Sequence, residues 1–554
     1  MPQVTAQEVQ RHASPSDAWL VVEGGVYDVT SYLDSHPGGK ALLLRYAGKD
    51  ATQAFKAAHS TSVLSQLPQH AYKGRLAIAH NDDGTQDDQA HKYLQSDSDT
   101  KLLEAQQRQN EQVALARKRL PRLKDITNLD DMESAALTVL PPLAAAFYAG
   151  GSDTEASLHA NRLAFSRYYF NPRVLRRVDK VDTSVTLFGK QYPLPIIGSA
   201  VGNTHMAGPD CDWHLTKGLA QCHLPHMVST FAATSILDLQ ERAKTENVDA
   251  NHFLQLYVQR DHTTSARLVK QAVQGGAHAV FVTVDVAQIG NREKDRKIRA
   301  GSQPAPSWGP DEARWIDDGD AAAAVLVDRD GLQETGISAR GSAATSTAGM
   351  DCDLNWEDIE WIKEAAEGKP VILKGIQSLS DALLAADAGV AGIVLSNHGG
   401  RQLDYARPPM DLLYDLRHRH PEMFDRLDVF MDGGIRRGTD ILKAMCLGAK
   451  AVALGRPLVF AEAAYRHLGV VKTIRSKLHM HFRRTLCSAF GCSLTSVHLP
   501  HFACLVLEEE ILTGMRLLGA ARIADLTPEM VERVDFYGPA IASHVASKHL
   551  AGRL

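Results

Sequence analysis

Eight short apolar runs between residues 194 and 457 constrain the fold of this chain more than any other feature. Most are separated by helical patterns such as DALLAADAG, and in order they read LPIIGSAV, PHMVSTF, HFLQLYV, AVFVTVD, PVILKGI, GIVLSNH, DVFMDGG and AVALGRP. Short runs that are rich in Val, Ile and Leu on both faces are typical of a buried parallel sheet. Eight such strands alternating with helices predict a closed (β/α)8 barrel, the TIM barrel.

The barrel takes up only part of the 554 residues, so we predict a multidomain chain. Residues 1–80 have the pattern of a small α+β domain, with two short strands in AWLVVEGGVYDVT around a Gly24-Gly25 turn. Residues 81–120 begin polar and acidic and continue with a helical pattern, which predicts a linker or hinge. The barrel domain is then expected over 121–554.

Composition narrows the class of protein. The hydrophobic content of 44% and the charged content of 23% are those of a soluble globular chain. A net charge of −5 argues against a nucleic-acid partner, which usually requires a basic surface. The sequence has no apolar run long enough for a transmembrane segment and no leader pattern at its start, so we expect a cytoplasmic protein from the sequence as given.

Polar residues gather at the carboxyl ends of the predicted strands. In a barrel this rim carries the active site, whereas the opposite rim mostly serves stability. A run of solvated loop residues is the alternative, but six consecutive strand ends with such residues argue against it. The residues are Gln255, Tyr257, Thr283, Asp285, Lys374, Ser396, His398, Asp432 and Arg456.

The residue types at this rim suggest chemistry at the α carbon of a small acid. Arg401 has a planar guanidinium that suits a carboxylate, and His398, three residues earlier, is a candidate general base. Asp285 is placed to orient the imidazole and to favour its protonated form. Lys374 would place positive charge beside an electron-accepting ring.

The ends of the seventh and eighth strands suggest a phosphate site. MDGGIRRGTD and LGRP combine glycines with basic residues at the position where barrels often bind phosphate through backbone N–H groups. A lone Asp-Gly-Gly is more often a plain turn, and only its place in the strand order favours the phosphate. The candidates are Gly433, Gly434, Gly455, Arg436 and Arg456.

His36 and His59 lie 23 residues apart in the small N-terminal unit. His36 precedes Pro-Gly-Gly, a turn that lets a flat ligand approach the backbone, and His59 ends the helical pattern DATQAFKAAH. An isolated histidine is more often a surface or core residue than a ligand. Two neutral imidazoles facing each other across an apolar slot would instead hold haem iron from both sides and leave it to transfer electrons.

Residues 3–80 resemble the cytochrome b5 domain. The matching residues are HPGG at 36–39, AGKDAT at 47–52 and the second histidine, His59. The resemblance implies a b-type haem with His36 and His59 as axial ligands of its iron.

Residues 120–540 resemble the FMN-dependent α-hydroxy acid dehydrogenase and oxidase family. The resemblance is carried by SNHGGRQLD at 396–404 and DGGIRRGTD at 432–440. A haem domain fused in front narrows it to the flavocytochrome b2 type, the cytochrome-linked L-lactate dehydrogenases. It implies oxidation of an L-2-hydroxy acid, by default L-lactate, to the 2-keto acid by FMN. Electrons would then pass through haem b to an acceptor such as cytochrome c.

The resemblance also implies a role for each rim residue. The catalytic set is His398, Asp285, Arg401, Tyr257, Lys374 and Arg292, with His398 as base and Tyr257 bonded to the substrate hydroxyl. The flavin contacts are Ser199, Ala200, Gly202, Ser229, Gln255, Thr283, Lys374, Ser396, Asp432, Gly433, Gly434, Arg436, Gly455 and Arg456. A homotetramer and a location in the mitochondrial intermembrane space follow from the same resemblance, the latter as an alternative to the cytoplasm.

The chain departs from the family pattern at several points. Phe147 stands where the family has a tyrosine that helps to bind the carboxylate, with Tyr148 next to it. Gly202 and Phe231 stand where the family shapes the pocket for the substrate side chain. Residues 476–504 form an insertion of unusual composition, and residues 300–350, rich in Gly, Ala, Ser and Asp, are expected to be a mobile loop.

Two alternative functions remain open at this point. One is a 2-hydroxy acid oxidase that passes electrons from FMN to O2. The other is a haem-binding or redox-sensing protein whose barrel is inactive.

Overall fold

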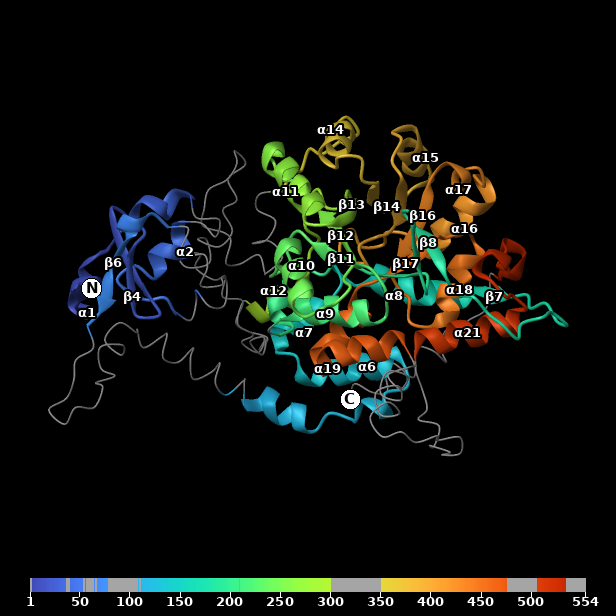
Figure 1. The fold of residues 1–554 in the computed structure, drawn as a ribbon, viewed down its shortest axis with the longest axis horizontal. Coiled ribbons are helices and arrows are strands. Elements are labelled where there is room, and N and C mark those ends of the chain that lie inside the picture. Colours follow the sequence, from blue (N-terminus) through green and yellow to red (C-terminus); the bar gives the residue numbers. More distant parts are fainter. Residues whose placement is uncertain are drawn as a thin grey trace, which may run out of the picture. The chain divides into compact units, whose positions relative to one another are not determined.

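The computed structural model places the following residues well enough to describe: 2–35, 40–52, 55, 64, 67–77, 108, 111–208, 210–299, 350–475 and 506–534. They form two compact units, one N-terminal up to Leu115 and one that contains residues 116–298 and 350–534 (Figure 1). The proposed haem ligands His36 and His59 lie outside the described residues, as do the loop residues 300–349 and the insertion 476–504. Among the described helices, none combines the length and the apolar character that crossing a membrane requires.

The N-terminal unit is built on a sheet with hydrophobic clusters on both faces. Its strands are ordered β1-β6-β4-β3-β2, with β5 paired to β3. In β3, Leu20 and Val22 pack into one cluster and Val21, between them, packs into the other, as the period of two in a strand requires. The bounds are β1 Gln3–Val4, β2 Ala13–Ser14, β3 Asp17–Val22, β4 Gly25–Asp28, β5 Lys49–Asp50 and β6 Tyr72–Leu76.

The hairpin predicted in AWLVVEGGVYDVT exists, but its turn lies one residue earlier than predicted. Val22 pairs with Gly25, so the two-residue turn is Glu23-Gly24, and both turn residues have positive φ, 51° and 75°. This turn type matches the right-handed twist of the flanking strands. Gly25 is the first residue of β4 and not part of the turn, which corrects the Gly24-Gly25 assignment.

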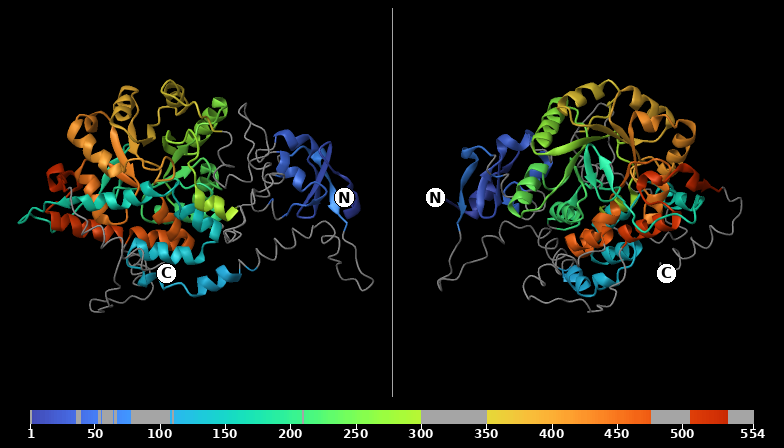
Figure 2. Two further views of the ribbon diagram at one scale, coloured as in Figure 1. Left: turned by 180° about the vertical axis from the view of Figure 1, so that it is seen from behind. Right: turned by 45° about the vertical axis from the view of Figure 1, so that its right-hand side comes forward.

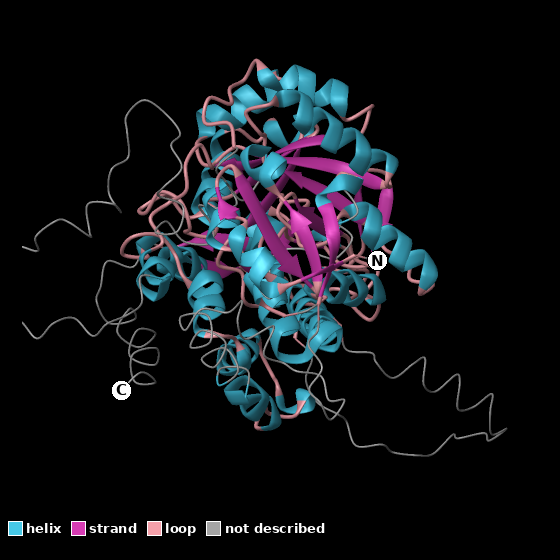
Figure 3. Cartoon of the chain, turned by 90° about the vertical axis from the view of Figure 1, so that its left-hand side faces the viewer, coloured by secondary structure: helices cyan, strands magenta, loops and turns pink. Residues whose placement is uncertain are grey.

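The second unit contains a closed barrel of eight parallel strands, so the TIM-barrel prediction is confirmed. Each predicted apolar run supplies one strand, and the helices enclose them (Figures 2 and 3). The strands are β10 Ile196–Gly198, β11 His226–Ser229, β12 His252–Leu256, β13 Ala277–Thr283, β14 Val371–Ile376, β15 Gly392–Leu395, β16 Asp428–Asp432 and β17 Ala451–Leu454.

Aromatic side chains fill part of the barrel interior. Phe253, Phe281 and Phe430 come from β12, β13 and β16, and all three are fully buried. Phe188 lies in the turn between β8 (Val185–Leu187) and β9 (Lys190–Tyr192), and its ring meets all three at centroid distances of 5.6–6.2 Å. The β8–β9 hairpin thus packs against the interior, and this burial of apolar area stabilises the barrel.

The amino-terminal rim of the barrel holds a buried histidine pair. His226 and His252 are the first residues of β11 and β12. The Gln240 amide in α10 (Ile236–Thr245) donates to His252 Nδ1 at 2.9 Å. Thr216 Oγ1 in α9 (Cys211–Gln221) lies 3.3 Å from His252 Nε2 and 2.9 Å from His226 Nδ1. Both rings can be neutral in this chain of bonds: His252 donates to Thr216, which donates to His226.

Burial lowers the pKa of His226 to about 3 and that of His252 to about 4. An unfolded histidine has a pKa near 6.5, so the unfolded chain binds more protons below that pH. The stability that the neutral rings contribute is therefore complete above about pH 6.5 and is lost as the pH falls toward the folded values.

We predict that the free energy of unfolding of the barrel decreases between pH 7 and pH 5. Each of these histidines contributes a slope of up to about 1.4 kcal/mol per pH unit. Replacing both with Gln should flatten this dependence in urea titrations at the two pH values. The exposed His159→Gln is the matched control and should leave the slope unchanged. An equal slope in the double variant would contradict the prediction.

Candidate active site

A row of hydrogen-bonded polar side chains lines the carboxyl ends of three neighbouring strands. Ser229 Oγ ends β11 and donates to Gln255 Oε1 at 2.9 Å. The Gln255 amide in β12 donates to Thr283 Oγ1, at the end of β13, over 2.8 Å. All three side chains are buried. Because parallel strands end at one edge, residues far apart in sequence form a continuous polar wall there.

Lys374 lies within β14 and is buried at the same rim. Its Nζ is 3.2 Å from Asp432 Oδ2, at the end of β16, and 3.4 Å from Ser396 Oγ, just after β15. Burial by itself lowers the pKa of Lys374, but the carboxylates of Asp432 and Asp285 outweigh burial and hold the pKa above its ordinary value. Lys374 is therefore a permanent buried cation at neutral pH.

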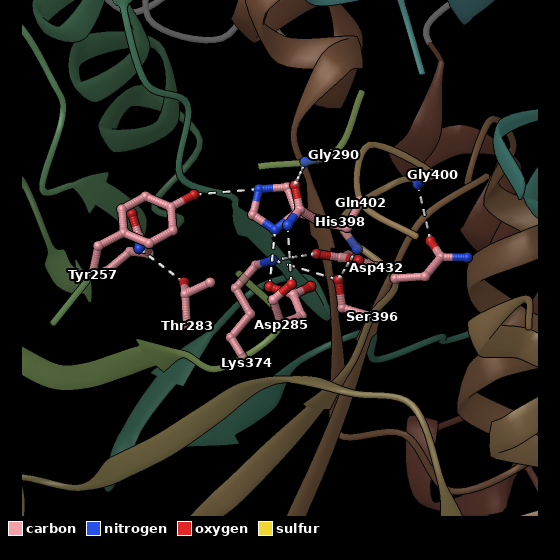
Figure 4. Close-up of polar contacts among 12 residues, drawn as sticks. Tyr257, Thr283, Asp285, Gly290, Lys374, Ser396, His398, Gly400, Gln402 and Asp432 are labelled. Atoms are coloured by element: carbon pink, nitrogen blue, oxygen red, sulfur yellow. Dashed lines mark hydrogen bonds and ion pairs between the residues drawn. The ribbon is translucent and has the colours of Figure 1, made fainter. Parts of the chain in front are cut away.

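His398 is held between a carboxylate and a phenol (Figure 4). Its Nδ1 is 3.0 Å from Asp285 Oδ1, and its Nε2 is 3.3 Å from the Tyr257 hydroxyl. The backbone at His398 has a φ of 56°, and its N–H donates to Ser396 Oγ. With the Nδ1 proton donated to Asp285, Nε2 is left with its lone pair facing Tyr257.

The electrostatics suit a neutral base with an anionic partner. Burial lowers the pKa of His398, Asp285 opposes this, and the cation of Lys374 adds to it, so that the pKa lies below its ordinary value. Burial raises the pKa of Asp285, but His398 and Lys374 together hold it below its ordinary value. Burial raises the pKa of Tyr257, so its hydroxyl keeps its proton.

Two arginine side chains approach the ring of Phe147, which lies in α7 (Pro142–Ala149). The guanidinium carbon of Arg401 is 4.8 Å from the ring centroid, and that of Arg292 is 5.8 Å away. Arg401 also donates to the carbonyls of Phe147 and Gly150. Burial, with the neighbouring charges of Arg292 and Arg456, lowers the pKa of Arg401 well below its ordinary value. An anion placed between the two guanidinium groups would relieve this repulsion.

Two arginines after β16 and β17, Arg436 and Arg456, make contacts within the protein. Arg456 donates to the carbonyls of Tyr148, Gly399 and Gly150 at 2.9–3.0 Å. Arg436 contacts the carboxylate of Glu133 in α6 (Leu129–Val139). Their contact with a cofactor phosphate stays a prediction.

Glycines bring the same region close to other backbone. Gly434 has a φ of 80°, and a Cβ there would lie 2.1 Å from the Asn161 carbonyl oxygen, so only glycine allows α8 (Ala156–Ala164) to approach. Gly433 lies near the Asn161 side chain. Gly455 immediately precedes α19 (Arg456–Ile474), and a Cβ there would lie 3.9 Å from that of Ser199.

The predicted residues after β10 form a further wall. Ser199 is buried, and Ala200 and Gly202 are partly exposed. A Cβ at Gly202 would lie 3.5 Å from that of Phe231, whose ring stacks on Tyr257 at a centroid distance of 5.0 Å. The aromatic pair thus connects this wall to His398.

Sequence reasoning assigned no role to three polar residues of SNHGGRQLD. Asn397 and Asn161 exchange two hydrogen bonds, of 2.7 and 2.8 Å, between their buried amides. Asp404 accepts from the backbone N–H groups of Ala156 and Ser157 and so caps α8, whose own preceding residue does not. Gln402 is bonded to the loop after β13. Their position within the motif could have marked these residues as important. The sequence does not show which groups they bond to.

Comparison with known proteins finds relatives of both parts of the chain. Residues 136–497 match the family model FMN-dependent dehydrogenase, and residues 5–77 match the cytochrome b5-like heme/steroid binding domain. The L-lactate dehydrogenase (cytochrome) of Wickerhamomyces anomalus is 33% identical over 542 residues, which are 97% of this chain and 81% of that one.

Two further relatives resemble the barrel. The peroxisomal (S)-2-hydroxyacid oxidase GLO3 of Arabidopsis thaliana is 34% identical over 64% of this chain and 90% of its own length. The crystal structure of the flavin-binding domain of baker's yeast flavocytochrome b2 superposes with a TM-score of 0.60 at 30% identity. It covers 81% of this chain and 96% of that structure.

The match of the barrel model over most of the chain, together with the second domain model, supports the resemblance drawn from the motifs and favours an enzyme over an inactive haem-binding protein. This chain therefore belongs to the FMN-dependent dehydrogenase family, as an oxidoreductase whose FMN barrel is joined to a cytochrome b5-like domain for haem b.

Proposed function

We propose that this chain oxidises an L-2-hydroxy acid, with L-lactate as the default substrate, to the 2-keto acid, and passes the electrons through haem b to an acceptor such as cytochrome c. The observation that carries the proposal is the neutral His398, paired with Asp285, next to the two crowded guanidinium groups of Arg401 and Arg292. A base beside two guanidinium groups that can bind a carboxylate suits proton removal from a small acid.

The residues present fit a flavin. The Lys374 ammonium and the Gln255 amide offer donors to the polar edge of a flat ring, and Asp432 Oδ1 is buried without a hydrogen-bond partner among the described residues. When bound, FMN would supply a two-electron acceptor beside the substrate and a one-electron donor to haem. The proposed contacts are the polar wall of Ser229, Gln255 and Thr283, together with the other flavin contacts predicted from the sequence.

The side chains would act in sequence on the substrate. Arg401 and Arg292 would bind its carboxylate, and the Arg292 Nε, which is buried without a partner among the described residues, would be satisfied by it. The Tyr257 hydroxyl would hydrogen-bond the substrate hydroxyl. His398 Nε2 would take a proton, and Asp285 would stabilise the imidazolium that forms.

The test of this function is stopped-flow mixing with a panel of L-2-hydroxy acids while the flavin and haem absorbance are followed together. We expect flavin bleaching followed by haem reduction with at least one acid. His398→Gln should slow flavin reduction by about 10²- to 10⁴-fold and leave the haem spectrum intact. Flavin reduction at the wild-type rate in this variant would contradict the role of His398, and failure of every acid would contradict the function.

The second candidate function is a 2-hydroxy acid oxidase that passes electrons from FMN to O2, because an oxidase relative matches the barrel over 64% of this chain. Steady-state assays separate the two. Reduction of cytochrome c in excess of hydrogen peroxide formation supports the dehydrogenase, and the reverse supports the oxidase.

The pocket wall of Gly202 and Phe231 bears on which acid is preferred. The missing side chain at Gly202 leaves room for about one methyl group before Phe231 is reached, and the Phe231 ring stacked on Tyr257 offers an apolar face. We propose that the panel will rank acids with side chains larger than that of lactate at least as high as lactate itself.

Phe147→Tyr is predicted to lower the KM for a short hydroxy acid. The added hydroxyl would extend from a ring that is in contact with both Arg401 and Arg292, and one hydrogen bond to the carboxylate is worth about 1 kcal/mol, or roughly fivefold in KM. Tyr148 does not substitute for it in this structure, because its hydroxyl donates to the Asn203 carbonyl at 2.8 Å. Tyr148→Phe is the matched control and should not lower KM. An unchanged KM in Phe147→Tyr would contradict the prediction.

We further propose a homotetramer, with a contact face on the loop that precedes β8. Leu175 is fully exposed and Val174 is 80% exposed. The loop is fixed in place, because the Arg173 N–H donates to the Leu518 carbonyl at the end of α21 (Leu507–Leu518), beside the 71% exposed Leu517. Exposed apolar side chains on a fixed loop are typical of subunit contacts.

Light scattering should show that Leu175→Glu lowers the oligomeric mass of the native protein. Leu163→Glu, at a leucine that is 47% exposed elsewhere on the barrel domain, should not lower it. A tetramer that persists in Leu175→Glu would move the contact elsewhere. For the compartment, the proposed acceptor favours the mitochondrial intermembrane space, and fractionation of the native host tests this.

A further inference from the structure

Gln402 connects the two loops that carry the proposed catalytic groups. Its side chain is buried, with a relative exposure of 6%. The amide donates to the carbonyls of Asp285 at 3.1 Å and Gln288 at 2.8 Å. Its oxygen accepts the Gly290 N–H at 3.3 Å (Figure 4). All three partners are backbone groups of the loop after β13, whereas Gln402 itself lies in the loop after β15.

The contact between these loops is tight at Gly290. A Cβ at this position would lie 2.6 Å from the Arg401 carbonyl, 2.7 Å from the Gln402 carbonyl and 2.5 Å from Ser152 Oγ. No side chain fits there without moving one loop away from the other. The backbones of the two loops therefore touch directly at Gly290, and the Gln402 amide fixes how they are aligned.

The joined loops carry both halves of the proposed chemistry. The loop after β13 supplies Asp285, the partner of His398, and continues to Arg292. The loop after β15 supplies His398 and also Arg401, the residue before Gln402. The distance from Asp285 to His398, and the spacing of the two guanidinium groups around Phe147, both depend on how these loops are aligned.

We propose that Gln402 is a positioning residue that sets both the basicity of His398 and the spacing of the arginine pair by clamping the loop of Asp285–Arg292 onto the loop of His398–Gln402. The proposal rests on the function proposed above. The hydrogen bonds of Gln402 to the described residues go to backbone groups, so it acts through the backbone that carries the imidazole and the guanidinium groups. An amide suits this position because it offers two donors and an acceptor at once, whereas a carboxylate offers no donor.

Gln402→Met tests the clamp, because methionine has a similar length and volume but makes none of the three hydrogen bonds. Release of the loop would move Asp285 away from His398, and Asp285 is the group that raises the pKa of His398 against burial. The acid limb of the pH profile for flavin reduction should therefore move to lower pH by about one unit. The turnover number should fall by ~10- to 100-fold, and KM should rise as the arginines separate.

The matched control is Gln240→Met at the opposite rim. It removes an amide that is likewise hydrogen-bonded to a buried partner, but this partner, His252, is the first residue of β12, at the end away from the catalytic rim. It should lower the stability and leave the pH profile unchanged. A Gln402→Met variant that behaves in the same way would overturn the proposal and make Gln402 a scaffold residue.

Two further variants keep the outcome decisive if Gln402→Met does not fold. Gly290→Ala should force the same loops apart and shift the acid limb in the same direction. In an Asp285→Asn background, Gln402→Met should produce no further shift of the limb, because the charge through which it acts is already gone. A full additional shift there, or loss of bound flavin in both Gln402→Met and Gly290→Ala, would overturn the proposal.

A measurement without turnover separates this proposal from the proposed function. Histidine-labelled protein allows the pKa of His398 to be followed by NMR, with His398→Gln identifying the signal. A lower pKa of His398 in Gln402→Met supports the clamp even if no hydroxy acid reduces the flavin. An unchanged pKa contradicts the clamp even if the wild-type enzyme oxidises lactate.

Discussion

The active end of this barrel depends on holding several buried cations close together. Lys374, Arg292, Arg401 and Arg456 lie near one another, and burial lowers the pKa of each arginine. Neighbouring arginines lower the pKa of Arg401 and Arg456 further, that of Arg456 to about 9. Each is compensated differently. Lys374 faces Asp432, whereas Arg401 and Arg456 are held by backbone carbonyls that carry partial negative charge but cannot take a proton. Because these groups only partly compensate the positive charges, the site attracts an anion.

The same arrangement explains the behaviour of the base. His398 is surrounded by positive charge and low polarity, which disfavours its protonated form, and Asp285 opposes this. When an anionic substrate enters, it would offset part of the positive charge, so His398 would become more basic at the moment when a proton must be taken. The substrate would thereby strengthen its own base, and no conformational change is needed for that.

The sequence was enough to predict the barrel, because strands buried on both faces have a composition that surface elements lack. It was also enough to predict that His398, Asp285, Lys374 and Asp432 would meet, since the ends of parallel strands share one rim. Contacts made by other elements were out of reach. That Phe147, in a helix before the barrel, meets two rim arginines depends on packing over some 250 residues of chain.

Other contacts could not be predicted from the sequence because they are made to backbone groups, which every residue has. Any buried amide has the bonding capacity of Gln402, and nothing in its neighbours says that it reaches the loop after β13. The sequence does not say whether the Tyr148 hydroxyl could replace the one missing at Phe147, and the structure shows it bonded to the Asn203 carbonyl. The hairpin turn was misplaced by one residue because Gly24 and Gly25 are equally good turn formers, and only strand pairing decides between them.

The buried pair of His226 and His252 lies at the end of the strands away from the reacting groups. The residues that set the acid sensitivity of folding and those proposed to set turnover thus lie at opposite ends of the barrel strands. Evolution toward an acidic habitat, or the engineering of a biosensor for acidic media, could replace both histidines with residues that do not titrate. The catalytic rim would not have to change.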